Sequence, residues 1–105
     1  MEPSDRDGPA APIRDGVLVR ELQIINRKGL HARASAKFVQ TVERYESDVT
    51  VTRCGETVGG RSIMGLLTLG AAQGTSITVT AEGEDAHACL DGLAALLASR
   101  FGEDE

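Results

Sequence analysis

The chain has 105 residues, a formal net charge of −5 and an aromatic content of only 3%. This length supports one small domain, and its core must come from aliphatic side chains. No Lys/Arg-rich run is present, which argues against a nucleic-acid binder, and no apolar run approaches the roughly 20 residues that cross a bilayer. The N-terminus lacks the hydrophobic stretch of a secretory signal, so we expect a soluble cytoplasmic protein without membrane insertion.

The first half of the chain predicts a tail, a strand and a helix. Residues 1–14 combine proline, glycine, alanine and charge, which is typical of a disordered tail before a domain that spans 15–102. Alternating apolar and polar side chains over 18–25 predict a half-buried strand. From His31 to about Ser47 the period is helical. The apolar stripe of this helix consists of Ser35, Phe38, Val39 and Val42.

The second half of the chain changes period three more times. Residues 48–60 alternate again and are interrupted near Cys54, which predicts a hairpin. The elements that follow are a short apolar helix over 62–70 that ends at Gly70, a strand over 75–83 and an amphipathic helix over 84–101. The residues of the last helix expected to face inward are Ala86, Cys89, Leu90, Leu93, Leu97 and Phe101. Residues 103–105 are expected to form a frayed acidic end.

The element order β-α-β-β-α-β-α predicts an α+β fold. Because the strands have one polar face, we expect an open-faced β-sandwich, in which three helices cover one face of a four-stranded antiparallel sheet. Cys54 and Cys89 lie far apart without a CxxC spacing, and we interpret them as two reduced thiols. No ligand spacing around the cysteines or the two histidines suggests a metal site.

His31 is the candidate functional residue, because it stands where a helix begins and a serine or aspartate cap is usual. Gly29 permits a tight turn before it. The positive end of a helix favours a neutral, nucleophilic imidazole. A phosphoryl group on that ring would lie over free N–H donors and within reach of Arg33. The alternative is an ordinary surface histidine, as we expect for His87.

Ser62 is the expected N-cap of the short helix, and this structural role alone accounts for a serine there. The four apolar residues that follow are more than one and a half turns of helix can bury; they are Ile63, Met64, Leu66 and Leu67. An exposed patch that contains methionine is typical of a docking surface. A phosphate on Ser62 would change the charge of that surface.

Three segments together resemble a known family. "GLHAR" at the first helix, "RSIMGLLTLG" at the second and "QGTSITVTAEGEDA" before the last resemble the histidine-containing phosphocarrier protein HPr of the bacterial phosphoenolpyruvate-dependent phosphotransferase system. The similarity runs from about residue 17 to 101, with the segments in order and no gap. It implies the same fold, a four-stranded antiparallel sheet with three helices on one side.

The resemblance also implies roles and partners. His31 would be phosphorylated at Nδ1 by phospho-enzyme I and would pass the group to IIA-type acceptors, while Arg33 stabilises it. Ser62 would match the serine modified by an HPr kinase/phosphorylase where one exists. The docking residues would be Leu30, Ala36, Ile63, Met64 and Leu67. The protein would be a monomeric carrier without a cofactor, not an enzyme, and would serve either sugar uptake or a nitrogen-related regulatory branch.

Two features depart from the family pattern. Ala34 stands where many members carry proline, which should loosen the helix start, and the segment before the first strand is longer than usual.

Two other functions remain open at this point. One alternative is a regulator that acts through Ser62 alone, although such proteins lack the histidine. The other is a small-molecule-binding domain, for which this core leaves little room.

Overall fold

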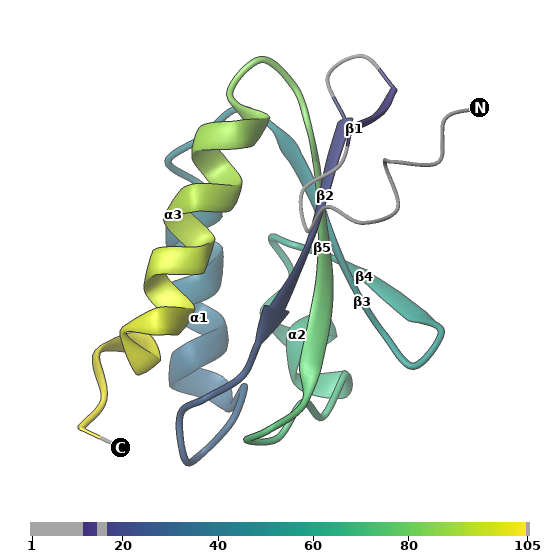
Figure 1. The fold of residues 1–105 in the computed structure, drawn as a ribbon. Helices are drawn as coiled ribbons and strands as arrows, with labels where there is room; N and C mark the ends of the chain where they lie inside the picture. The colour runs from purple at the N-terminus through teal and green to yellow at the C-terminus, as the bar shows by residue number, and fades with distance from the viewer. Residues whose placement is uncertain (1–11, 15–16, 105) are drawn as a thin grey trace.

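The computed structural model describes residues 12–14 and 17–104 as an antiparallel sheet with helices on one side (Figure 1). The strands are β1 (Pro12–Arg14), β2 (Val17–Gln23), β3 (Asp48–Arg53), β4 (Glu56–Gly59) and β5 (Ser76–Glu82). The helices are α1 (Ala32–Val42), α2 (Ile63–Thr68) and α3 (Ala86–Ala98), followed by a short 3₁₀ segment, η2 (Arg100–Gly102). The predicted fold class is confirmed.

All neighbouring strands pair antiparallel, in the order β1-β2-β5-β3-β4. The four predicted strands are present, and β1 adds a fifth at one edge. Because β1 falls within the segment predicted to be a disordered tail, that prediction is wrong for residues 12–14; residues 1–11 lie outside the described part of the chain. Without β1, the backbone groups along one edge of β2 would be unpaired. β1 pairs with them and is itself the edge strand of the sheet, a position where a proline such as Pro12 is tolerated.

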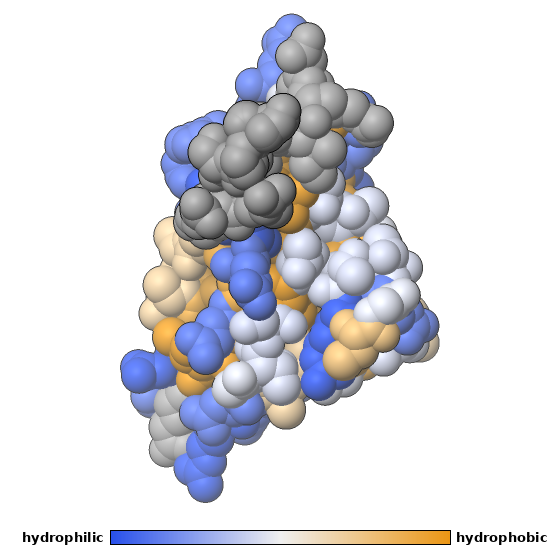
Figure 2. All heavy atoms as spheres, turned by 45° about the vertical axis from the view of Figure 1, so that its right-hand side comes forward, coloured by the Kyte–Doolittle hydropathy of each residue, from blue (hydrophilic) through white to orange (hydrophobic). Residues whose placement is uncertain are grey.

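One face of the sheet forms the core with the helices. α1 and α3 lie side by side over it in Figure 1, and α2 contacts both α1 and β4. Fully buried side chains from both layers meet there, among them Val51, Ile77, Val79, Phe38, Val42, Leu90 and Leu93. Threonines alternate with the core residues along β3 and β5, and Figure 2 shows neutral to hydrophilic atoms over much of its right-hand side. The predicted apolar stripes of α1 and α3 are buried, which confirms the helical period as far as Leu97. Phe101 is buried as well, but it lies in η2, beyond the end of α3.

Two helices end three or more residues earlier than the sequence predicts, while α2 ends within two residues of its predicted end. α1 stops at Val42 and not near Ser47, because the Asp85 carboxylate accepts the N–H of Glu46 at 2.8 Å and the Ser47 hydroxyl. These groups therefore bind α3's N-terminal side and do not continue α1. α3 stops at Ala98, because the next residues turn into left-handed backbone, with a φ of 56° at Phe101.

No helix in the described part of the chain is long and apolar enough to cross a membrane. Cys54 is an exposed free thiol in a left-handed turn, and Cys89 is a buried free thiol in α3. Burial raises the pKa of Cys89 to about 11, so this thiol stays protonated at neutral pH and acts as a small core residue.

Candidate functional site

The loop that leads into α1 is fixed on both sides by its backbone. Gly29 has a φ of +69°, and a Cβ added there would lie 2.6 Å from the carbonyl oxygen of Ala71. The same carbonyl accepts the N–H of Leu30 at 2.9 Å. Asn26 is fully buried and donates its side-chain Nδ2 to the Gly29 carbonyl at 2.8 Å. Only glycine allows both the left-handed turn and this close approach.

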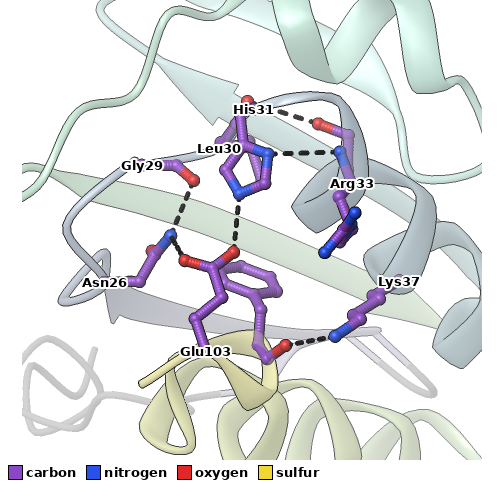
Figure 3. A network of polar contacts seen from close by, with 9 residues as sticks. Asn26, Gly29, Leu30, His31, Arg33, Lys37 and Glu103 are labelled. Atoms are coloured by element: carbon purple, nitrogen blue, oxygen red, sulfur yellow. Dashed lines mark hydrogen bonds and ion pairs between the residues drawn. The ribbon is translucent and has the colours of Figure 1, made fainter. Parts of the chain in front are cut away.

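His31 occupies the N-cap position of α1, as the sequence predicts, and its side chain also accepts a capping hydrogen bond. Its backbone is extended, with φ −81° and ψ −175°, and its Nδ1 accepts the N–H of Arg33 at 3.2 Å (Figure 3). The first N–H groups of a helix have no intrahelical acceptors, so Nδ1 lies over the positive end of α1. The side chain is 28% exposed, which leaves the ring accessible to a partner.

The other ring nitrogen of His31 meets a carboxylate from the far end of the chain. Nε2 lies 2.6 Å from Oε2 of Glu103, and Oε1 of the same carboxylate accepts Nδ2 of Asn26 at 3.1 Å (Figure 3). Partial burial by itself raises the pKa of Glu103. The hydrogen bonds from His31 and Asn26, with the positive charge of Lys28, outweigh this and hold that pKa below its ordinary value. The carboxylate is therefore ionised at neutral pH.

Sequence reasoning missed Glu103, since residues 103–105 were expected to fray. That expectation is wrong for Glu103, whose side chain is only 18% exposed and is hydrogen-bonded to two residues of the site. Lys37 of α1 adds a further tie, because its Nζ donates to the carbonyl oxygen of Phe101 at 2.6 Å. The one available signal was Gly102, a residue that often follows a helix in left-handed conformation.

A hollow of about 420 Å³ lies beside this network. It is lined by Arg27, Lys28, Arg33, Lys37, Gly102, Glu103 and Asp104. Four cations against two carboxylates give it an excess of positive charge in a chain whose net charge is −5. The Arg33 guanidinium is exposed and has no hydrogen bond or ion pair to the rest of the described chain. An anion that approaches His31 therefore meets a locally positive surface.

Ser62 caps α2, again as predicted: its Oγ accepts the N–H of Gly65 at 2.9 Å. A Cβ at Gly65 would lie 2.9 Å from Cβ of Val58 and 3.0 Å from the Ser62 hydroxyl, which explains why no glutamate completes a capping box there. Ser62 is exposed, and no contact joins it to His31 within the described residues. The structure thus brings His31 and Arg33 together and keeps Ser62 separate.

The expected docking residues differ in how accessible they are. Met64 is 71% exposed and Ile63 is 39% exposed, the two most exposed large apolar side chains described. Ala36 and Leu67 are half-buried. Leu30 was expected to be a docking residue, but its side chain is only 4% exposed and belongs to the core, so it is not available to a partner. The reason is that its N–H bonds to Ala71 and draws the chain inward.

His87 is exposed, and its Nδ1 lies 3.2 Å from Asp91 one turn along α3. Asp91 also accepts the guanidinium of Arg20 from β2 at 2.9 Å. This exposed surface cluster ties α3 to the sheet. Among the described residues, no group of three or more acidic, histidine or cysteine side chains is arranged to hold a metal ion.

Comparisons with known proteins agree with this geometry. A family model described as "PTS HPr component phosphorylation site" matches residues 18–99. The phosphocarrier protein HPr of Xylella fastidiosa (strain Temecula1) is 46% identical over 88 residues, covering 84% of this chain and 99% of that protein. That of Cupriavidus necator is 45% identical over 89 residues, covering 85% and 100%.

A solved structure gives the same result for the fold. The crystal structure of HPr-C-His from Thermoanaerobacter tengcongensis matches with a TM-score of 0.79 and 38% identity, covering 83% of this chain and 98% of that chain. The family model spans well over half of the chain, and the match covers these two relatives almost from end to end. The chain therefore belongs to the HPr family, the phosphocarrier proteins of the phosphotransferase system.

Proposed function

We propose that this protein carries a phosphoryl group on Nδ1 of His31, accepting it from one protein and donating it to another. The observation that supports this most directly is the position of Nδ1 over the N-terminus of α1, 3.2 Å from the N–H of Arg33. In the first transfer, the Nδ1 lone pair forms a bond to phosphorus while the bond to the donor breaks and its electron pair passes to the donor. The reverse step returns that pair to Nδ1.

The residues around His31 suit both steps. When a phosphoryl group replaces the contact between Nδ1 and the Arg33 amide, that N–H becomes a donor to a phosphoryl oxygen. The exposed guanidinium of Arg33 supplies a second, charge-assisted donor. Most of the barrier is lowered by geometry that each partner completes. The protein is thus a stoichiometric carrier and a substrate of its partners, and not an enzyme with turnover of its own.

The partners that fit this role are phospho-enzyme I as donor and IIA-type proteins as acceptors, in the cytoplasm. The test is to incubate the purified chain with enzyme I and phosphoenolpyruvate and to look for acid-labile, base-stable phosphate. We expect one phosphate per chain, which disappears in His31→Ala and persists in His87→Ala. Phosphate that survives His31→Ala would overturn the proposal, because it would locate the acceptor elsewhere.

We also propose that phosphorylation of Ser62 slows transfer at His31. Ser62 is exposed and adjoins Ile63 and Met64, so a phosphate would add two negative charges to the docking patch of an acidic protein. An acidic partner would then be repelled. An HPr kinase/phosphorylase is the enzyme that would add this phosphate.

Ser62→Asp and Ser62→Asn are a matched pair for this test, because both residues cap a helix well and only aspartate is charged. We expect Ser62→Asp to raise the KM for phosphorylation by enzyme I, while Ser62→Asn stays near the wild-type value. Equal KM values for the two variants would count against regulation through charge at this position.

A further inference from the structure

We propose that Glu103 is the positioning residue of His31. Its carboxylate accepts the Nε2–H of the imidazole and thereby holds the lone pair on Nδ1, the atom that takes the phosphoryl group. The inference rests on the proposed function and adds to it a named residue from the C-terminal end of the chain.

The two ring contacts of His31 select one tautomer. Nδ1 accepts the N–H of Arg33, so it cannot carry a proton there. Nε2 lies 2.6 Å from a carboxylate oxygen of Glu103, and two acceptors at that distance need a proton between them. The ring is therefore the Nε2–H form with its lone pair on Nδ1. A carboxylate that receives the other N–H of a histidine fixes its orientation and raises its basicity.

The carboxylate of Glu103 is itself held in place. Asn26 donates to Oε1, which leaves Oε2 for His31, and Asn26 is fully buried and tied to the Gly29 carbonyl (Figure 3). Lys28 and Lys37 line the same hollow. Within the described residues, the hydrogen bonds of Glu103 nevertheless go to His31 and Asn26 and not to these cations.

The chain after α3 adopts an uncommon conformation that brings Glu103 to this position. Arg100, Phe101 and Gly102 have φ values of 58°, 56° and 76°, in succession. Two consecutive non-glycine residues in the left-handed region are strained, and such strain persists only where surrounding contacts enforce it. Here Phe101 is 1% exposed, and its carbonyl accepts Nζ of Lys37 at 2.6 Å. The turn thus anchors the residue that contacts the site.

The same contact balances charge during transfer. When Nδ1 bonds to phosphorus, its lone pair is used, and the ring with its Nε2–H becomes positively charged. The ionised carboxylate of Glu103 lies directly against that N–H, so it stabilises the charged ring without taking its proton. When the acceptor attacks phosphorus, the electron pair returns to Nδ1 and the ring is neutral again.

The experiment combines transfer kinetics with nitrogen NMR of the ring in the full-length chain. We expect Glu103→Ala to lower the maximal rate of phosphorylation by enzyme I about 10- to 100-fold with little change in KM, and Glu103→Gln to restore part of it because it retains an acceptor. Glu84→Gln removes an exposed carboxylate that does not line this hollow and is expected to stay within about twofold of wild type.

The ¹⁵N shifts of His31 distinguish positioning from a structural role. The wild-type ring should show a protonated Nε2 and an unprotonated Nδ1, and in Glu103→Ala the two resonances should move towards each other as the tautomers exchange. Wild-type rates in Glu103→Ala, or slow transfer with unmoved resonances, would overturn the proposal. If the wild-type chain is not phosphorylated on His31, the proposed function fails instead, so the two failures are distinguishable.

Discussion

At the residue scale, Gly29 shows how the backbone fixes the position of His31. Its φ of +69° and a virtual Cβ 2.6 Å from the Ala71 carbonyl predict that Gly29→Ala is strained in two ways. Gly70 has a similar φ of +61° with nothing within 4 Å, so Gly70→Ala carries only the conformational penalty of about 1 kcal/mol. We expect Gly29→Ala to lower the free energy of unfolding by about 2–4 kcal/mol in urea titrations. Equal losses for the two variants would show that the close contact is relieved by a small shift.

The site also shows which residues a sequence can reveal. His31 and Arg33 lie two positions apart at a helix start, so local rules indicated that Arg33 could reach a phosphoryl group on His31, and the resemblance to HPr made this the preferred interpretation. Glu103 is 72 positions from His31 and reaches it only through a left-handed turn made by non-glycine residues. Neither composition nor periodicity reports such a turn, because it depends on tertiary contacts such as the Lys37–Phe101 hydrogen bond.

At the element scale, the turn after α3 contains strain that a substitution can release. Arg100 is exposed with a φ of 58°, and no hydrogen bond of its side chain is present in the described chain. We expect Arg100→Gly to raise the free energy of unfolding by up to about 1 kcal/mol, since glycine adopts this conformation without the Cβ penalty. Arg100→Ala removes the same charge but retains the Cβ and should give no gain. Identical stability of the two variants in urea would contradict the strain argument.

Asp85 links two elements, and its ionisation makes that link dependent on pH. The Ser47 hydroxyl, followed by the Glu46 N–H, holds the pKa of Asp85 below its ordinary value of 3.8. A group whose pKa is lowered by folding stabilises the protein above the unfolded-state value and loses that effect as the pH falls through the folded-state value.

We therefore expect Asp85→Ala to be less stable than wild type at neutral pH, with the difference shrinking as the pH falls below about 4. Urea titrations across that range measure it. Glu84→Ala, at an exposed neighbouring position, is the control and should leave the stability nearly unchanged. A difference between wild type and Asp85→Ala that stays constant down to about pH 2 would mean that the carboxylate's charge is not what stabilises the link.

Element types followed from the sequence, whereas several element ends did not. The alternation in β5 and the apolar stripes of α1 and α3 predicted buried faces that the structure confirms, because one buried face imposes a period on the chain. The end of α1 depends on Asp85, 38 positions beyond Ser47, and β1 depends on the free edge of β2. Such ends are set by partners distant in sequence, so local patterns do not contain them.

At the scale of the whole molecule, the apolar exposure of α2 complements the polar site at His31. Ile63 and Met64 are exposed, although burying them would enlarge a small aliphatic core. Leu66 on the same helix is fully buried. Exposed apolar side chains such as Ile63 and Met64, on a helix that is anchored by a buried leucine, are typical of a surface that binds another protein. Because α2 contacts α1, a protein bound to this patch would lie next to the helix that presents His31.

The difference in exposure between Met64 and Leu66 predicts different effects for two substitutions on α2, one on partner binding and one on stability. Met64→Ala removes exposed apolar area, so we expect a stability change within about 0.5 kcal/mol, while the KM for phosphorylation by enzyme I rises about fivefold or more and the maximal rate is retained. Leu66→Ala leaves a cavity in the core and should lower the free energy of unfolding by about 2–5 kcal/mol. Urea titration and transfer kinetics on both variants measure these effects. An unchanged KM in Met64→Ala would place the docking surface elsewhere, whereas a reduced maximal rate would indicate that α2 acts on the chemistry at His31 and not only on docking.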